Sequence, residues 1–202
     1  MIKNNKGFTL VEIVAVVALL GIISTIVFPQ IFKLVKESRN KIYVQDAIRL
    51  IAKAQYSMSA KSNQIEKPDS GQALVFGMNY LANDDFTSTP NGGTYLMDYS
   101  FVLVKNISGK YYYSVMLVEE VGPNDYRGIE LSTESALRAN NAIDHVKVFN
   151  KNQIAYVGDE TNPIEGSLTF GTSFVQGKVK GIDSNDNGKW SSIVIADKYI
   201  NP

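Results

Sequence analysis

The stretch Lys6-Gly7-Phe8-Thr9-Leu10-Val11-Glu12 opens a long apolar run that ends at Phe28-Pro29. Among the 21 residues from Phe8 to Phe28, only Glu12 carries an ionisable side chain. A helix of this length spans about 31 Å, which is close to the hydrocarbon thickness of a bilayer. A carboxylate inside such a segment costs roughly 2.5–3.5 kcal/mol on insertion scales, so Glu12 requires a partner.

The segment before the run, Met1–Gly7, is short, polar and basic, as in the first part of a secretory signal. The apolar run is longer than the apolar part of a cleaved signal, which has about 7–15 residues. No small-residue cleavage site closes the run, because its exit reads Ile26-Val27-Phe28-Pro29. The run is therefore predicted to stay in the mature protein as a membrane anchor.

These residues carry a family resemblance. The segment Lys6–Glu12, followed by an unbroken apolar helix, resembles the class III signal of type IV pilins and pseudopilins. The resemblance covers roughly residues 1–60 and is specific across about the first 30. It implies that residues 1–7 are a leader, which a membrane-bound prepilin peptidase removes by cutting after Gly7. It also implies that the new N-terminal residue, Phe8, is N-methylated.

In the same resemblance, Glu12 is the glutamate through which subunits assemble. Cleavage creates a free amine on Phe8, one helical turn from Glu12, and the partnerless N–H groups of that turn also favour an anion. When subunits stack, Glu12 of one copy can pair with the cationic N-terminus of its neighbour. Such a pair fixes axial register more than it adds net stability. The alternative is that Glu12 only extends to the headgroups at its own end of the run.

Pro29 falls where many pilins carry a proline that kinks or locally melts the helix. It lacks an N–H group, and its ring crowds the carbonyl of Thr25. Gly21 and Ser24 weaken the helical preference further. The sequence predicts a bend or a loosened turn between Gly21 and Pro29; the alternative is that Pro29 marks the membrane exit.

Residues 30–67 are predicted to continue the helix to a total of about 55–60 residues, since no glycine or proline occurs before Pro68. A mainly apolar stripe recurs at helical spacing: Ile31, Leu34, Val35, Val44, Ala47, Ile48, Ile51, Gln55 and Met58. The opposite, polar face is expected to hold Lys36, Glu37, Arg39, Asp46, Arg49 and Lys53. Residues 8–29 would then lie in the membrane or the filament core, and residues 30–67 against a sheet.

Residues 68–202 are predicted to form a globular head of the α+β class, a pilin-like roll with an antiparallel sheet of four or more strands on the helix. Strands are expected over Tyr99–Lys105 and Tyr111–Glu119, Val146–Phe149 and Gln153–Val157, and Leu168–Phe174 and Ser192–Ala196. Asn106-Ile107-Ser108-Gly109 and Asn150-Lys151-Asn152 are the expected hairpin turns, and Gly122–Asp125 breaks the second strand. Short helices are expected over Ala73–Leu81 and Ser132–Ala139.

Composition narrows the function classes. The chain has no cysteine, which excludes disulfides and thiolate metal sites. Its 20 basic and 20 acidic residues give a formal net charge of zero, so nothing favours a nucleic-acid partner. No nucleophile or phosphate-binding motif appears, and one histidine, His145, cannot make a zinc site or a conventional triad. We expect no enzymatic activity and interpret His145 as structural.

Two further features have a functional and a structural interpretation. Asp183, Asn185 and Asn187 begin like an EF-hand loop, but the twelfth position is Val194 instead of glutamate. A non-EF calcium loop and a simple Asn/Asp/Gly turn both fit, and the turn is preferred. The triplet Tyr111-Tyr112-Tyr113 must place side chains on both faces of its strand, for sheet packing or for an adhesive or assembly surface.

We therefore predict a type IV pilin-like subunit whose partners are copies of itself and related pilins in a helical filament. The resemblance adds a prepilin peptidase/methyltransferase, an assembly platform and an ATPase motor as partners. It places the precursor in the cytoplasmic membrane, with one span, and the filament on the cell surface. The alternatives are a pseudopilin of a type II secretion or DNA-uptake machine and a membrane-anchored receptor that does not polymerise. Motility and adhesion are both compatible with the sequence.

Overall fold

The computed structural model describes residues 9–60, 67–70, 73–82, 85–86, 88–123, 125–150, 174–182 and 189–196, the last two ranges as backbone. Its elements, in chain order, are α1 (Leu10–Ala60), β1 (Ala73–Gly77), α2 (Met78–Leu81), η1 (Met97–Tyr99), β2 (Phe101–Ile107), β3 (Lys110–Gly122), β4 (Asp125–Thr133), α3 (Glu134–Leu137), η2 (Ala142–His145), β5 (Val146–Asn150), β6 (Phe174–Ile182) and β7 (Lys189–Ala196). The chain divides into two compact units, residues 1–38 and 39–202. We call residues 10–38 the stem segment and the unit from Arg39 onward the head.

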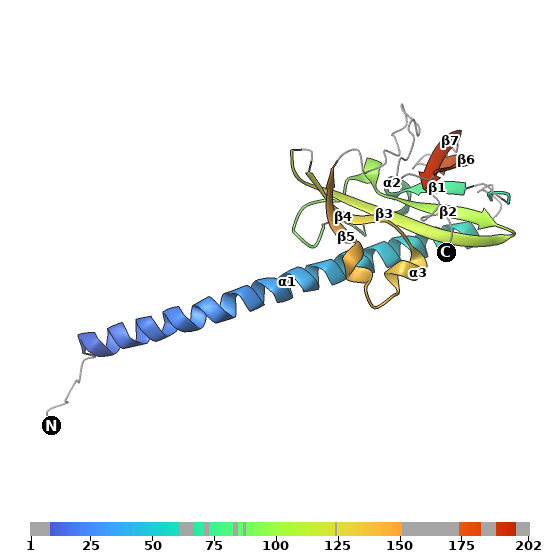
Figure 1. Ribbon diagram of the computed structural model, residues 1–202. Coiled ribbons are helices and arrows are strands. Elements are labelled where there is room, and N and C mark those ends of the chain that lie inside the picture. Colours follow the sequence, from blue (N-terminus) through green and yellow to red (C-terminus); the bar gives the residue numbers. More distant parts are fainter. Residues whose placement is uncertain are drawn as a thin grey trace, which may run out of the picture. The chain divides into compact units, whose positions relative to one another are not determined.

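The head contains a sheet of seven strands in the order β5-β4-β3-β2-β1-β6-β7 (Figure 1). Neighbouring strands from β1 to β5 are antiparallel, and so are β6 and β7. Among the described strands, only β1 and β6 pair in parallel, in a register that joins Ala73 to Val179. The predicted α+β class is confirmed, and the mainly antiparallel sheet carries one parallel pairing that was not predicted.

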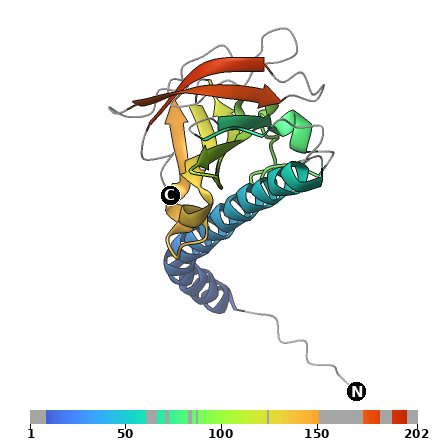
Figure 2. The same ribbon diagram turned by 90° about the vertical axis from the view of Figure 1, so that its right-hand side faces the viewer.

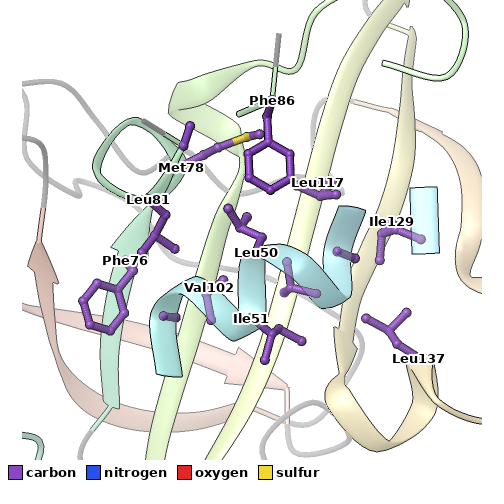
Figure 3. Close-up of a cluster of buried hydrophobic side chains, with 14 of the residues drawn as sticks. Leu50, Ile51, Phe76, Met78, Leu81, Phe86, Val102, Leu117, Ile129 and Leu137 are labelled. Carbon is purple, nitrogen blue, oxygen red and sulfur yellow. The ribbon is translucent and has the colours of Figure 1, made fainter. Parts of the chain in front are cut away.

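The head portion of α1 packs against one face of the sheet (Figure 2). Its buried apolar residues are Tyr43, Val44, Ala47, Leu50, Ile51, Ala54 and Met58. They meet strand residues that alternate along β1 to β4: Leu74, Phe76, Val102, Val104, Val115, Leu117 and Ile129. Figure 3 shows Leu50 and Ile51 pointing from the helix into this cluster. Because burial of one such side chain contributes about 1.5–3 kcal/mol, this layer contributes strongly to the head's stability.

The expected hairpin between β2 and β3 is confirmed. Ser108 and Gly109 have φ values of 52° and 87°, as a two-residue turn matched to strand twist requires. Ile107 and Lys110 close the turn as a pair, so Asn106 and Ile107 belong to the strand instead of the loop. The amide of Gly109 donates to the Asn106 side chain at 2.8 Å, which holds the turn in this conformation.

The first predicted short helix is wrong, since Ala73–Gly77 forms the strand β1 and only Met78–Leu81 is helical. All five residues of β1 are buried between β2 and β6. A short, continuously apolar segment has no alternation that separates a buried strand from a buried helix. Tertiary pairing therefore decides the structure of this segment.

Strand β4 was not predicted at all, because register shifts interrupt its alternation against β3. At Gly128 the backbone has a φ of 146°, and a Cβ there would lie 2.0 Å from the carbonyl oxygen of Leu117. Only glycine fits this close approach between strands. The expected helix over Ser132–Ala139 is shorter than predicted, with Thr133 as its N-cap and Glu134–Leu137 as its helical residues.

The remaining boundaries follow the prediction in part. Val146–Phe149 lies in β5 as expected, and Ser192–Ala196 lies in β7, which begins earlier, at Lys189. Gln153–Val157 and the first six residues of Leu168–Phe174 lie outside the described residues. Helix α1 ends at Ala60, residues 61–66 are outside the described ranges, and Lys67, the predicted end, is not helical. Lys67 precedes Pro68, and a residue before proline avoids the helical region.

Candidate functional site

The first turn of α1 holds Glu12 in a capping box. The backbone N–H of Thr9 donates to Oε2 of Glu12 at 2.8 Å, and the Thr9 hydroxyl donates to the same oxygen at 3.0 Å. In return, the backbone N–H of Glu12 lies 3.3 Å from the Thr9 hydroxyl oxygen. Thr9 therefore acts as N-cap and Glu12 as the third helical residue, so that two otherwise partnerless amides are satisfied.

This geometry changes what Glu12 needs. The sequence predicts a partner for Glu12 in the N-terminus of another copy, and the structure shows Thr9 of the same chain as a partner. The signal for this pairing, a threonine three residues before a glutamate at a helix start, was present in the sequence and was not used. Gly7 and Phe8 lie outside the described residues. The contact between Glu12 and a neighbour's amine stays a prediction.

From Leu10 to Val35, the surface of the stem segment is mainly apolar, and most of its large apolar side chains are exposed. Its exposed large apolar residues are Leu10, Val11, Ile13, Val14, Val16, Val17, Leu19, Leu20, Ile22, Ile23, Ile26, Val27, Phe28, Ile31, Phe32, Leu34 and Val35. The two hydroxyls in this run bond to the helix itself, Ser24 to the carbonyl of Leu20 and Thr25 to that of Ile22, both at 2.7 Å. A polar group that is satisfied within the helix does not oppose burial in lipid.

Helix α1 is long and apolar enough to cross a membrane. Gly21 and Pro29 both lie within it, and a Cβ added at Gly21 would meet nothing within 4 Å. Gly21 is therefore tolerant of small side chains in the single chain. The bend or loosened turn between Gly21 and Pro29 stays a prediction.

Comparison with known proteins identifies the N-terminus. Residues 2–28 match the family model described as the prokaryotic N-terminal methylation motif. The chain has the N-terminus of a type IV pilin-like protein. Comparisons with curated proteins and with solved structures found no match. The matched region covers the predicted cleavage site, Glu12 and the apolar run, so the resemblance to type IV pilins is confirmed over these residues, and it supports processing as a prepilin.

The head holds a second polar arrangement, which the sequence does not predict. Two buried carboxylates, Asp46 and Glu119, are 8% and 2% exposed. Glu119 accepts hydrogen bonds from the hydroxyl of Tyr43 and from Nδ2 of Asn91, the latter at 2.7 Å. Asp46 accepts from the hydroxyl of Tyr95 at 2.8 Å and pairs with Arg49 at 3.3 Å. We call Tyr43, Asp46, Asn91, Tyr95 and Glu119 the carboxylate cluster.

The cluster corrects one position of the predicted polar face. Asp46 was expected to face solvent, but it lies on the buried side of α1 beside Tyr43 and Ala47. Burial, followed by the neighbouring carboxylates, raises the pKa of both tyrosine hydroxyls, which therefore stay protonated as donors. Asn91 also accepts from Arg39 at 3.3 Å, so the loop that carries Asn91 is tied to both helix and sheet. The cluster therefore connects α1, β3 and the segments that carry Asn91 and Tyr95 through buried hydrogen bonds.

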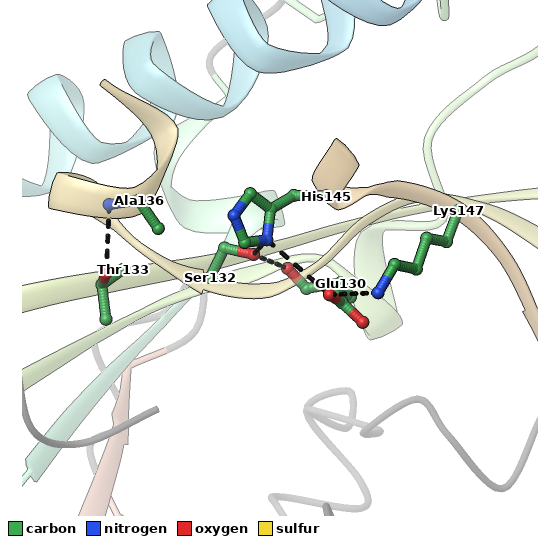
Figure 4. A network of polar contacts seen from close by, with 6 residues as sticks. All are labelled: Glu130, Ser132, Thr133, Ala136, His145 and Lys147. Atoms are coloured by element: carbon green, nitrogen blue, oxygen red, sulfur yellow. Dashed lines mark hydrogen bonds and ion pairs between the residues drawn. The ribbon is translucent and has the colours of Figure 1, made fainter. Parts of the chain in front are cut away.

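His145 ends η2 and contacts Ser132 and Glu130 (Figure 4). Both contacts use the same ring nitrogen, Nδ1, at 3.0 Å from the Ser132 hydroxyl and 3.7 Å from the Glu130 carboxylate. The Ser132 hydroxyl donates to the backbone carbonyl of Glu130 at 2.7 Å, so its proton is already used. A nucleophilic triad needs its two partners on different ring nitrogens, and this arrangement does not provide that.

The other candidate residues take unremarkable positions or lie outside the described ranges. Tyr111 and Tyr113 pack against the helix-side core, and Tyr112 lies on the opposite face with Lys110 at 5.1 Å from its ring centre. The predicted division of the triplet between both faces is confirmed. Asp183, Asn185 and Asn187 are outside the described residues. Among the residues that are described, no group of three or more His, Cys, Asp or Glu side chains could hold a metal ion.

Proposed function

We propose that this protein is a structural subunit of a type IV pilus-like filament. It is made as a membrane-anchored prepilin, cut after Gly7, N-methylated at Phe8 and polymerised through α1. The observation that carries the proposal is the methylation motif over residues 2–28, which leads directly into an exposed apolar helix. A helix that is apolar all round needs lipid or other helices around it.

Assembly exchanges one apolar environment for another. Before assembly, lipid chains surround the stem segment; in the filament, the stem segments of neighbouring copies replace them. Attraction then comes from close packing of side chains such as Leu19 and Ile23, since lipid is as apolar as the helix. The Phe8 amine, created by cleavage, supplies the cation that Glu12 of a neighbouring copy can bind, which sets the axial register.

The proposal implies a sequence of partners. A prepilin peptidase/methyltransferase acts on Gly7 and Phe8 at the cytoplasmic membrane. An assembly platform and an ATPase motor then lift the subunit out of the bilayer into a filament of copies and related pilins. The head, with its own folded core, becomes the surface of the filament outside the cell.

Mass spectrometry of the mature N-terminus tests the processing step. The full chain, produced in a bacterium with a prepilin peptidase, is expected to begin at Phe8 and to carry one N-methyl group. Gly7→Val should block the cut, because its side chain crowds the protease at the scissile bond. Gly21→Ala is the matched control and should be processed normally. An intact Met1, or any start other than methylated Phe8, would overturn the processing claim.

A charge-removing variant tests assembly. Glu12→Gln keeps an oxygen for Thr9 but loses the charge that pairs with an amine. The yield of sheared surface filaments is expected to fall about tenfold or more, because each 1.4 kcal/mol of contact energy changes an equilibrium tenfold. Glu37→Gln is the control, since Glu37 is a stem carboxylate that pairs with Lys33 of its own helix at 3.9 Å.

The same preparation separates the alternatives. Wild-type yield from Glu12→Gln would show that Glu12 does not set register. Processed wild-type protein that forms no filament at all would favour an anchored monomer. Short filaments confined to the cell envelope, in place of long surface filaments, would favour a secretion or uptake pseudopilus.

A further inference from the structure

Two exposed lysines, Lys33 and Lys36, lie near the C-terminal end of the stem segment. The side chain of Lys33 is 78% exposed, and Lys36 is exposed as well. Residues three apart on a helix are neighbours on its surface, so the two ammonium groups can reach one anion. Glu37 pairs with Lys33 at 3.9 Å, but an ion pair this exposed contributes little, and a stronger anion can replace it. The next basic residue, Arg39, already donates to Asn91 at 3.3 Å.

The two lysines alternate with large apolar side chains that are also exposed. Phe32 is 71% exposed, Leu34 64% and Val35 41%. A mixture of apolar and basic side chains suits the boundary between the hydrocarbon and the headgroups of a bilayer. There the apolar side chains enter the hydrocarbon, and lysines extend along it to the phosphates.

The position of Lys33 along α1 agrees with such a boundary. The 20 residues between Glu12 and Lys33, Ile13–Phe32, contain no ionisable side chain. Along the helix axis Glu12 and Lys33 are about 31 Å apart, which is close to the hydrocarbon thickness of a bilayer. Side chains of a helix lean toward its N-terminus, so those of Lys33 and Lys36 lean back toward the headgroups at this end of the span.

We propose that Lys33 and Lys36 bind the phosphodiester of an anionic phospholipid, in the leaflet at the C-terminal end of the span. Charge selects this ligand, because a zwitterionic lipid adds an ammonium group that the lysines repel. The bound lipid fixes the depth of the unassembled subunit in the membrane. This proposal rests on the membrane-anchored precursor of the proposed function, and it does not depend on polymerisation.

The lipid selectivity of the full chain in a bilayer tests the site. The chain is reconstituted into phosphatidylcholine vesicles, and its resistance to extraction by alkaline carbonate is measured first. Phosphatidylglycerol or phosphatidylcholine, spin-labelled on an acyl chain, is then added in trace amounts. Electron paramagnetic resonance measures the fraction of each lipid that the protein immobilises. Wild type is expected to prefer phosphatidylglycerol about threefold or more, since one lysine near the headgroups contributes up to about fivefold.

Substitutions of the lysines assign the preference to this site. Lys33→Gln combined with Lys36→Gln should abolish it, and each single variant should lower it. Lys33→Arg combined with Lys36→Arg keeps both charges and should retain it. Lys110→Gln is the matched control for the single variants, because it removes the same charge from an exposed lysine outside the stem segment, and it should change nothing.

The outcomes separate this site from the membrane anchor. Wild type that resists extraction but shows no preference would overturn the lipid site alone. Wild type that carbonate extracts would contradict the anchored precursor, and the site with it. A preference that survives both lysine-to-glutamine changes, or that Lys110→Gln lowers equally, would also overturn the site. Loss of the preference in inorganic phosphate at constant ionic strength would show a site for free phosphate and overturn the assignment to lipid.

Discussion

The stem segment and the head are both rich in large apolar side chains, but only the head buries them. Leu20 and Phe28 of the stem segment are each 56% exposed, whereas Leu50 and Phe101 of the head are 0% exposed. In the head, the partners of an apolar side chain belong to the same chain. In the stem segment, lipid or other chains must supply them. Apolar side chains therefore stabilise the fold of the head, whereas those of the stem segment suit it to lipid or to other helices.

The largest expected effect compares a leucine from each region. Leu50→Ala should lower the free energy of unfolding of the head by about 2–5 kcal/mol, because it leaves a cavity in the core. Leu20→Ala should change it by less than about 0.5 kcal/mol, since Leu20 lies outside that core. Denaturant unfolding of the full chain in detergent, followed by the fluorescence of its single tryptophan, measures both. Equal losses would show that the two regions fold as one unit.

A second prediction compares a buried and an exposed tyrosine of α1. Tyr43→Phe removes the hydroxyl that donates to the buried Glu119 carboxylate and should cost about 1.5–3 kcal/mol, with no cavity. Tyr56→Phe is the matched control, because Tyr56 is 74% exposed on the same helix, and should be neutral. The same unfolding experiment applies. A neutral Tyr43→Phe would mean that Glu119 finds another donor.

Two threonine caps extend the comparison to helix ends. Thr133→Ala removes the acceptor for the amide of Ala136, at 3.3 Å, and should lower head stability by about 1 kcal/mol. Thr9→Ala removes the corresponding acceptor at the start of α1 but should leave global stability unchanged. Its effect should be local, as faster hydrogen exchange of the Glu12 amide. A global loss from Thr9→Ala would contradict the independence of the stem segment.

The smallest expected effect is a pH dependence at the surface of the head. The hydrogen bond and charge of Lys53 hold the pKa of Asp85 below its usual range. Because the folded-state pKa is the lower one, this ion pair stabilises the head above the unfolded pKa of about 4 and loses its effect as pH falls through the folded value. Asp85→Asn should therefore be slightly less stable than wild type at pH 7 and equal to it near pH 2, within the small range of exposed pairs. A pH-independent difference would assign the effect to packing.

The features that sequence reasoning found are those encoded locally. The N-terminal signal, the apolar run and the Ser108-Gly109 turn each depend on a few adjacent residues, and the motif match and the backbone conformation confirm them. The features that were not predicted depend on contacts between residues far apart in the sequence. Asp46 looks polar and exposed until Tyr95 lies beside it, 49 residues away in sequence. Strand β4 is hidden by a register shift that only its pairing with β3 reveals.

The capping box at Thr9 and Glu12 has a consequence for how a filament could be taken apart. A carboxylate that already has donors in its own chain gives up those bonds when an amine from a neighbour replaces them. Binding is then an exchange of nearly equivalent partners, with a small net free energy and a return route that leaves no bare charge behind. In the proposed filament, a subunit that leaves its neighbours would therefore return Glu12 to the donors of its own chain.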